Sequence, residues 1–447
     1  MIPINIPAGA EYIIEALETE GYEAWVVGGC VRDSLMGKEP KDWDICTSAL
    51  PEQYLKCFSN NKVIETGLKH GTITILINNI PYELTTFRID NEYSDNRHPD
   101  GVEFIDSLKG DLARRDFTIN AMAYNARNGL VDFFGGAEDL GKGIIKCVGE
   151  PDKRFREDAL RIMRALRFAA TLGFKIDKST STAMKKNKEL LNNIAVERIA
   201  AELSALIIGN NIYELFSENM QVILEIIPEL KASIGFDQNN IHHCYDVLTH
   251  TLHSVDSAKA DLHVRLCMLF HDIGKPMCYS EINGTGHFYG HTQLSADMTR
   301  KILRRLKYDN ETVSIVTQLV LYHDVKVAPK SRFIKRWLNR IGEQRLRQLI
   351  EVNRADVMAQ DPYYRDDRLK QLEEAQLLID EIIKQQQCFS IKDLAVNGSD
   401  LIDIGIIEGY EIGLILNRLV YMVIDEEIEN EKDQLIHAAK QLSKQSK

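Results

Sequence analysis

The stretch Trp25-Val26-Val27-Gly28-Gly29-Cys30-Val31-Arg32-Asp33, followed by Lys41-Asp42-Trp43-Asp44-Ile45-Cys46, decides the fold of the N-terminal part of this chain. An apolar run leads into two glycines, which let the backbone approach an anion because no Cβ stands in the way. The residues after them predict the first turns of a helix, whose N-terminal end also favours an anion. Asp42 and Asp44 alternate in an extended segment, so their side chains point to one face.

Paired carboxylates beside a phosphate cradle are an arrangement that holds Mg²⁺ against a nucleotide. The pattern therefore predicts a site for nucleotidyl transfer. In it Asp42 and Asp44 are the catalytic metal ligands, and the nucleotide is bound by Gly28, Gly29, Arg32 and Asp33. Glu83 lies between Tyr82 and Leu84 on a predicted strand. It is either a third catalytic carboxylate near the metal or a strand residue that faces water.

The hydrophobic pattern divides the chain into an α/β part and a helical part. Helical spacing of apolar residues predicts a helix over 8–20. Short runs rich in β-branched and aromatic residues predict strands at 24–27, 43–46, 62–64, 72–77 and 82–86. The polar stretch 88–99 is expected to be a mobile loop. After 149–151 the apolar spacing becomes helical almost to the end, with breaks near 228–238, 361–364 and 396–398.

The opening motif and two later motifs carry a family resemblance. Gly28-Gly29-x-x-Arg32-Asp33 with Asp42-x-Asp44 resembles the signature of polymerase-β-type nucleotidyltransferases. Arg114–Ala123 (RRDFTINAMA) and 156–168 (REDALRIMRALRF) make the chain similar, more narrowly, to class II tRNA nucleotidyltransferases (CCA-adding enzymes) and bacterial poly(A) polymerases. The resemblance implies template-independent addition of CMP and AMP to the 3′ end of tRNA, with tRNA, CTP and ATP as partners and Mg²⁺ as cofactor. An A-adding enzyme or a poly(A) polymerase shares these motifs and stays open.

Within these strings the residue types fit a nucleotide. Guanidinium groups match phosphate oxygens, and Asp or Asn hydrogen-bonds ribose hydroxyls, so Arg115, Asp116 and Asn120 are expected to bind triphosphate and ribose. The segment 156–168 is expected to be one helix. On it an Asp oxygen accepts from the amino group of cytosine or adenine while an Arg donates to the ring nitrogen, and guanine and uracil leave both unpaired. The expected pair is Asp158 and Arg161, supported by Arg164 and Arg167.

The segment Phe87–Asp100 resembles the flexible loop of CCA-adding enzymes. In that family the loop is thought to help the site change from accepting CTP to accepting ATP. Its presence here argues against an enzyme that adds only C.

A second set of motifs resembles a His-Asp (HD) phosphohydrolase domain. The predicted ligands of a second divalent metal are His250, His271, Asp272 and Asp356, with His291 and His323 matching positions that some HD domains use for a further metal. Mixed nitrogen and oxygen ligands suit a divalent ion. An alternative function is therefore a metal-dependent phosphohydrolase as the main activity. A non-catalytic RNA-binding protein is a third reading, against which the intact Asp42/Asp44 pair argues.

The charge of the chain places limits on nucleic-acid contact. The formal net charge is −12, so any RNA surface must be a local basic patch. Residues 330–347 supply one, with Glu343 as the single acid in that segment and Phe333 and Trp337 interleaved. Its expected RNA-binding residues are Lys330, Arg332, Lys335, Arg336 and Arg340. A solvated helix face is the alternative.

Together these patterns predict a multidomain α+β protein, with a polymerase-β-like head that contains a small mixed sheet and a mainly α-helical body that includes an HD domain. The expected divisions are a catalytic head (1–140), a helical nucleotide-selecting neck (141–230), an HD domain (231–365) and a C-terminal helical RNA-binding region (366–447). Eight cysteines without a C-x-x-C pair indicate reduced thiols. No long apolar run or leader is visible, so the expected location is the cytoplasm, without a membrane partner. The oligomeric state is left open.

Overall fold

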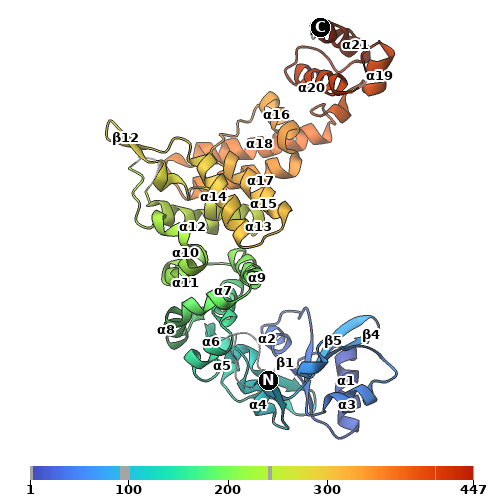
Figure 1. The fold of residues 1–447 in the computed structure, drawn as a ribbon, viewed down its shortest axis with the longest axis vertical. Helices are drawn as coiled ribbons and strands as arrows, with labels where there is room; N and C mark the ends of the chain where they lie inside the picture. The colour runs from blue at the N-terminus through green and yellow to red at the C-terminus, as the bar shows by residue number, and fades with distance from the viewer. Residues whose placement is uncertain (1–3, 91–100, 240–243, 408, 446–447) are drawn as a thin grey trace. The chain divides into compact units, whose positions relative to one another are not determined.

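The computed structural model describes residues 4–90, 101–239, 244–407 and 409–445. The chain forms two compact units, Met1–Pro228 (unit 1) and Glu229–Lys447 (unit 2), coloured from blue to green and from green to red in Figure 1. None of the helices formed by the described residues combines the length and apolar character that a bilayer crossing requires.

Unit 1 is built on a mixed sheet that has seven strands among the described residues, in the order β3-β4-β5-β2-β1-β8-β9. The strands are β1 Ala24–Val27, β2 Asp44–Thr47, β3 Lys62–Ile64, β4 Thr72–Ile77, β5 Ile80–Thr86, β8 Met122–Asn125 and β9 Gly129–Asp132. Strands β2 and β5 run parallel, and their register sets Asp44 directly opposite Glu83. Opposite residues in a ladder share a face, so these two carboxylates point to the same side of the sheet.

The predicted strands are confirmed, with shifts of one or two residues at β2 and β5. Asn78 and Asn79 form the two-residue turn between β4 and β5, and both have positive φ (52° and 65°). A turn of this kind matches the right-handed twist of the flanking strands, and Asn tolerates the left-handed conformation that it requires.

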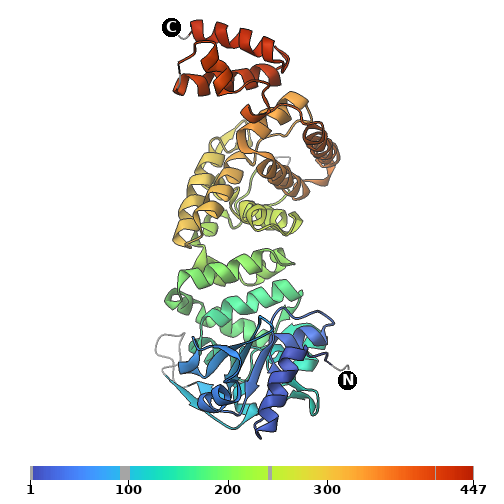
Figure 2. The same cartoon turned by 90° about the vertical axis from the view of Figure 1, so that its right-hand side faces the viewer.

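Helices cover one face of the sheet. They are α1 Ala8–Thr19, α2 Gly29–Leu35 and α3 Pro51–Cys57. Ile13, Ile14 and Leu17 of α1 are buried in one core cluster with Val26 and Ile45, and Figure 2 shows α1 lying across the blue strands. The opening helix predicted over 8–20 is therefore confirmed.

The other face of the sheet is also buried. Trp25 and Val27 of β1 pack there with Phe87 and with Leu112 of α4 (Leu108–Ala113). All four residues of β1 are buried as a result. The loop that follows β1 is thus fixed from both sides, which positions the Gly28-Gly29 turn.

The remaining part of unit 1 is mostly helical. Its helices are α5 Gly136–Lys142, α6 Pro151–Glu157, α7 Leu160–Leu172, α8 Lys178–Asn187, α9 Val196–Ile207, α10 Ile212–Glu218 and α11 Met220–Ile226. Two short strand pairs accompany them, β6 Arg88–Asp90 with β7 Val102–Phe104 and β10 Ile144–Ile145 with β11 Lys175–Ile176.

The prediction of one helix over 156–168 is wrong. Asp158 has an extended backbone (φ −136°, ψ 104°) and separates α6 from α7. Its Oδ1 accepts a hydrogen bond of 3.0 Å from the backbone N–H of Leu160. Asp side chains compete in this way with helical hydrogen bonds and favour helix starts over helix interiors. The loop expected over 88–99 is also wrong at its start, because Arg88–Asp90 form β6; residues 91–100 lie outside the described part.

Unit 2 is a helical assembly with one small hairpin among its described residues. The main helices are α12 Val247–Ser257, α13 Leu262–Phe270, α14 His291–Arg305, α15 Asn310–Tyr322, α16 Ser331–Ile341, α17 Glu343–Met358 and α18 Asp366–Lys384. The hairpin pairs β12 Ser280–Ile282 with β13 Thr285–His287. The chain ends in α19 Gly398–Asp403, α20 Tyr410–Ile424 and α21 Lys432–Gln445, which share a core and are coloured red in Figure 2.

The predicted fold class, a head with a mixed sheet followed by a mainly helical body, is confirmed. The expected helix breaks coincide with short 3₁₀ turns at Pro228–Ser233 and Pro362–Tyr364 and with the start of α19. The division into four domains and the presence of an HD domain in the body stay predictions.

Candidate functional site

The Gly28-Gly29 turn joins β1 to α2. Gly28 has φ 83° and ψ −127°, a conformation that residues with a Cβ rarely adopt. A Cβ at this position would lie 2.9 Å from Nη1 of Arg115, so the Arg115 guanidinium occupies the space directly over the turn. The glycine thus permits a close approach of a cationic side chain to the backbone.

Three carboxylates gather next to this turn. Asp44 opens β2, Asp42 precedes it in an exposed segment, and Glu83 stands opposite Asp44 on β5. Burial raises the pKa of Asp44 to about 6; Arg115 opposes this shift, while Asp42 and Glu83 add to it. A carboxylate surrounded by like charges favours a cation between them. The register places Glu83 on the same face of the sheet as Asp44, and Glu83 is exposed there, so its role as a third catalytic carboxylate stays a prediction.

A chain of charged hydrogen bonds connects α7 to α2. Asp116 Oδ2 accepts from Arg164 Nε at 2.8 Å and Nη2 at 2.6 Å, and its Oδ1 accepts from Asn120 Nδ2 at 3.1 Å. Asn120 Oδ1 in turn accepts from Arg32 Nη1 at 2.7 Å, and Arg32 Nε donates to Asp33 at 2.8 Å. Residues 32, 116, 120 and 164, far apart in sequence, thus act as one network.

The network determines the ionisation of Asp116. Burial alone would raise the pKa of this carboxyl group, but the bidentate Arg164 guanidinium, with help from Asn120 and Arg161, lowers it to about 2. Asp116 is therefore a fixed negative charge that holds Arg164 directly and Arg32 through Asn120. Its direct partners are the side chains of Arg164 and Asn120 and the backbone N–H of Phe117, which donates to Oδ1 at 2.8 Å, so its contact with ribose stays a prediction.

Phe168 was overlooked by the sequence reasoning. Its ring lies under three guanidinium groups, with Cζ of Arg167 at 4.0 Å, Arg32 at 5.1 Å and Arg164 at 5.3 Å from the ring centroid. The electron-rich face of an aromatic ring attracts cations and offsets part of the repulsion between them. The sequence did contain a signal for this contact, because the segment 156–168 ends with an aromatic residue directly after an arginine.

The expected base-reading pair, Asp158 and Arg161, lies at the same site but with other partners. Arg161 Nη1 donates to Glu157 Oε2 at 2.9 Å, and Nη2 donates to the carbonyl of Arg114 at 2.9 Å. Asp158 Oδ2 lies 3.8 Å from Nη2 of Arg198. The two side chains are therefore not paired with each other, and Arg161 is only 8% exposed.

One cavity of about 490 Å³ collects most of the predicted site residues. Its lining includes Gly28, Gly29, Arg32, Asp42, Asp44, Arg115, Asp116, Asn120, Asp158, Arg161, Arg164 and Arg167. Asp33 and Glu83 are not among the lining residues. Arg114, Phe168 and Arg198 line it too and were not predicted as site residues. Arg198 is on α9, away from any motif quoted from the sequence, so only the packing of α9 against α7 could reveal it.

A second cluster, in unit 2, brings together the predicted metal ligands. Nε2 of His250 lies 2.9 Å from Asp356 Oδ1 and 3.3 Å from Nε2 of His271. Nε2 of His271 lies 3.2 Å from Asp272 Oδ2. Two ligands held about 2.1 Å from one ion at tetrahedral or octahedral angles are roughly 3.0–3.4 Å apart. These separations match that spacing closely.

His291 and His323 extend this cluster through Asp272. Their Nε2 atoms lie 3.3 Å from each other and 3.6 and 3.5 Å from Asp272 Oδ1. Asp272 therefore faces two groups of imidazoles, one with each oxygen. Two sets of potential metal ligands share it, His250-His271-Asp272 and Asp272-His291-His323.

The outer nitrogens of the four imidazoles fix the direction of their lone pairs. The Nδ1 atoms of His250, His271, His291 and His323 lie 2.7–3.2 Å from the backbone carbonyls of Ala359, Met268, Phe288 and Val320. A carbonyl only accepts, so each Nδ1 donates and each neutral ring turns an Nε2 lone pair inward. Acceptors this close need a shared proton or a cation between them. The residues thus fit a divalent metal.

The charges of the cluster agree with this geometry. Burial opposes ionisation of His271, but the Asp272 and Asp356 carboxylates outweigh it and raise its pKa to about 10. Despite burial, His271 and Lys275, the latter at 2.6 Å from Asp272 Oδ2, hold the pKa of Asp272 well below its usual range, and His250 and His271 do the same for Asp356. Where no metal is bound, a proton on His271 takes the place of the cation.

The basic segment 330–347 is less free than its sequence indicates. Arg336 Nη2 lies 2.6 Å from Asp425 Oδ2, and Arg332 Nε lies 3.4 Å from Asp425 Oδ1. The guanidinium of Arg340 lies over the rings of Tyr322 and Trp337, at 4.9 and 5.3 Å. From the sequence, acidic residues were counted only within 330–347. This count therefore missed Asp425, which follows α20 and lies almost ninety residues after Arg336 in the chain. The role of these residues in RNA binding stays a prediction.

Three protein-family models match the chain. The "Poly A polymerase head domain" covers residues 24–146. A "Probable RNA and SrmB-binding site of polymerase A" covers 173–232, and "tRNA nucleotidyltransferase domain 2" covers 286–439. The head and two later stretches of the chain therefore match models of poly(A) polymerases and tRNA nucleotidyltransferases.

Two curated proteins that are similar to this chain are named CCA-adding enzymes. The CCA-adding enzyme of Ligilactobacillus salivarius is 43% identical over 263 residues, which are 56% of this chain and 65% of that protein. The CCA-adding enzyme of Limosilactobacillus reuteri is 50% identical over 202 residues, 45% of this chain and 50% of the relative. The chain therefore spans between half and two thirds of the length of these relatives.

A solved structure extends the likeness over nearly the whole chain. The CCA-adding enzyme of Bacillus stearothermophilus, in complex with CTP, matches with a TM-score of 0.70 and 29% identity, covering 98% of this chain and 97% of that one. The likeness therefore extends over both the mixed-sheet head and the helical body.

Proposed function

We propose that this chain adds CMP and AMP, without a template, to the 3′ end of tRNA. The observation that carries the proposal is the single cavity that collects Asp42, Asp44, the Gly28-Gly29 turn and an arginine network. Relatives named CCA-adding enzymes, and a similar structure that holds CTP, support the same substrates. The expected cytoplasmic location stays a prediction.

In this proposal Asp42 and Asp44, with Glu83 beside them, would hold Mg²⁺. The bound ion would make the terminal RNA hydroxyl more acidic and neutralise charge on the triphosphate. Arg32, Arg115 and Arg164 supply donors for the phosphates, and the Gly28-Gly29 backbone leaves room for them. No side chain is required as a general base.

The selection of cytosine and adenine is assigned to Asp158 and Arg161. Asp158 Oδ2 has Arg198 at 3.8 Å, which leaves that oxygen able to accept from an amino group. Arg161 has to exchange the carboxylate of Glu157 for a base, because both of its terminal nitrogens are engaged. Leaving both groups unpaired against guanine or uracil costs roughly 1–3 kcal/mol each. The pair therefore rejects these bases.

An incorporation assay tests this function. Purified full-length chain is incubated with tRNA that ends before CCA, and with tRNA that ends in CC, each with CTP, ATP or both. Addition of two C residues and one A to the first tRNA supports CCA addition. Addition of A alone to the second tRNA, without incorporation from CTP, assigns an A-adding enzyme, and long A tails assign a poly(A) polymerase. Binding of tRNA without any incorporation leaves only a binding role.

A second candidate function is favoured by the cluster in unit 2. Its inward-facing Nε2 atoms and its shared carboxylate fit a divalent metal centre, and we propose that the centre hydrolyses phosphate esters. Such an ion activates a water molecule and stabilises charge on the phosphoryl group. His271→Ala is expected to abolish hydrolysis of a phosphomonoester or cyclic phosphate and to leave nucleotide incorporation unchanged. Equal loss of both activities would contradict a separate centre.

A further inference from the structure

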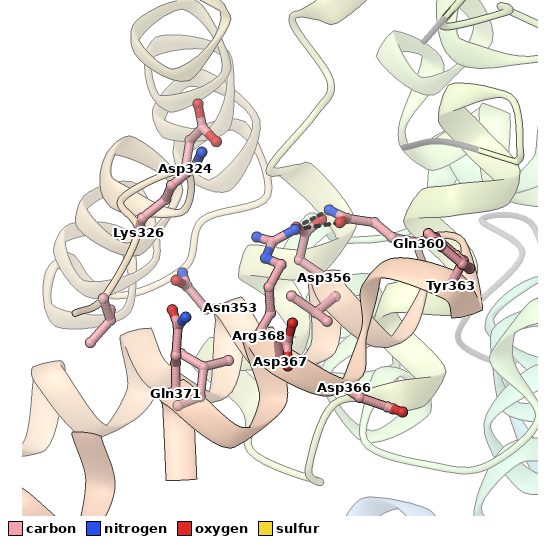
Figure 3. Close-up of a pocket in the computed structure, with 13 residues that line it drawn as sticks. Asp324, Lys326, Asn353, Asp356, Gln360, Tyr363, Asp366, Asp367, Arg368 and Gln371 are labelled. Atoms are coloured by element: carbon pink, nitrogen blue, oxygen red, sulfur yellow. Dashed lines mark hydrogen bonds between the residues drawn. The ribbon is translucent and has the colours of Figure 1, made fainter. Parts of the chain in front are cut away.

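We propose that Gln360 is a positioning residue for the metal ligand Asp356, and that Arg368 fixes the orientation of Gln360. The proposal rests on the metal centre proposed above. Figure 3 shows the three side chains in contact along the wall of a cavity. Gln360 Nε2 lies 2.6 Å from Asp356 Oδ2, and Arg368 Nη1 lies 2.5 Å from Gln360 Oε1.

Donor and acceptor chemistry allows only one orientation of this amide. An arginine has donors and no acceptor, so it must face the amide oxygen of Gln360. The amide nitrogen must then face Asp356, which accepts because it is ionised. Each hydrogen bond involves one charged partner, and such bonds are shorter and stronger than neutral ones. Gln360 is 6% exposed, so little of its amide is open to competition from water.

The contact decides which oxygen of Asp356 faces the metal centre. With Oδ2 taken by Gln360, Oδ1 is the atom next to Nε2 of His250 at 2.9 Å and of His271 at 3.6 Å. Without the amide, the carboxylate is free to rotate about its terminal bond. Gln360 thus holds the oxygen that a metal needs in one position.

The backbone at this point is fixed as well. Asp356 lies in the last turn of α17, and Gln360 follows two residues after the helix ends. The carbonyl of Ala359 lies 3.2 Å from Nδ1 of His250, and Arg365 Nε donates to the carbonyl of Gln360 at 2.8 Å. The end of α17 therefore contacts both nitrogens of His250, one through Asp356 and one through Ala359. Groups of this second layer commonly tune metal affinity by about 10–100-fold.

The test is a titration of metal-free, full-length protein with Co²⁺, followed by the visible absorption of the bound ion. Gln360→Met is expected to weaken Co²⁺ binding about 10–100-fold, and Arg368→Met to weaken it by a smaller factor. Gln371→Met is the matched control: Gln371 lines the same cavity one helical turn after Arg368 and is exposed. It is expected to bind Co²⁺ as wild type does.

Two further measurements separate the possible failures. His271→Ala is expected to remove the Co²⁺ signal; if it does not, or if wild type gives no signal, the metal centre itself is wrong. If wild type binds and His271→Ala does not, while Gln360→Met and Arg368→Met bind as tightly as wild type, the positioning role is overturned. Thermal unfolding without metal is recorded for each variant, because a merely structural role lowers the unfolding midpoint and leaves the affinity of the folded protein unchanged.

Discussion

The arginine-rich cavity of unit 1 and the histidine cluster of unit 2 use buried charge in opposite ways. In unit 1 the cations outnumber the acids, and the surplus is held in place by Asp116 and by the ring of Phe168. In unit 2 the carboxylates and Nε2 lone pairs face one another around Asp272. The surplus of guanidinium groups in the first arrangement fits an anion such as a phosphate, and the inward-facing acceptors of the second fit a divalent cation.

The largest expected effect tests whether the two sites act separately. Asp44→Ala removes a proposed Mg²⁺ ligand and is expected to reduce nucleotide incorporation on the order of a thousandfold, about 4 kcal/mol of transition-state stabilisation. Phosphohydrolase activity and Co²⁺ binding at the cluster should not change. His271→Ala is the reciprocal variant. Loss of Co²⁺ binding in Asp44→Ala would contradict the independence of the two sites.

A second prediction concerns the contribution of Glu83 to Mg²⁺ binding in unit 1. Because β2 and β5 set it opposite Asp44, Glu83→Gln removes one negative charge from the group and is expected to lower incorporation about 10–100-fold, mainly through weaker Mg²⁺ binding. The dependence of the rate on Mg²⁺ concentration checks this. Glu103 on β7, also exposed, supplies the control Glu103→Gln. Equal rates for wild type and Glu83→Gln at limiting Mg²⁺ would leave Glu83 as a surface residue.

The charge network of unit 1 predicts a pH effect on stability. The pKa of Asp116 falls from 3.8 to about 2 on folding. A lowered carboxyl pKa stabilises the fold above the unfolded value and loses that effect as pH falls toward 2, here roughly 2–3 kcal/mol. Asp116→Asn should therefore destabilise the protein at pH 6 and much less near pH 2. Denaturant unfolding of wild type and Asp116→Asn at several pH values measures this effect. If the difference in the free energy of unfolding between the two proteins does not change with pH, the lowered pKa of Asp116 is not its cause.

Phe168 predicts a moderate effect on substrate binding. Phe168→Leu keeps an apolar side chain but removes the ring shared by Arg32, Arg164 and Arg167, each such contact being worth roughly 0.5–2 kcal/mol. The KM for CTP and ATP is expected to rise about tenfold, with a smaller change in kcat. Phe174→Leu is the matched control, because Phe174 follows α7 by two residues and is not among the residues that line the cavity. An unchanged KM would mean that the arginines do not depend on the ring.

The smallest expected effect concerns the basic segment of unit 2. Asp425→Ser releases Arg332 and Arg336, and the free energy of unfolding should change by less than about 1 kcal/mol because both arginines are half exposed. If these arginines contact RNA phosphates, tRNA binding becomes tighter and more dependent on salt. Unaltered tRNA affinity in Asp425→Ser and in Arg336→Ala would exclude this segment from the RNA surface.

Most strands of the sheet, the opening helix and most residue types of the two sites could be predicted from the amino-acid sequence. Local apolar spacing and the Gly-Gly, Asp-x-Asp and His-Asp motifs act over a few residues, so β1, the Gly28 turn and the pairs Asp42/Asp44 and His271/Asp272 could be predicted directly. The break at Asp158 could not, because helical charge spacing continues across it while the side chain caps the next helix.

Only the tertiary structure decided which charges meet. Asp425 reaches Arg336 across about ninety residues, Arg198 reaches Asp158 by the packing of α9, and Gln360 reaches Asp356 through the end of α17. A sequence pattern counts charges along the chain, whereas Coulomb energy depends on distance in space and on burial. The motifs therefore identify which groups are present, and the fold determines the partner of each one.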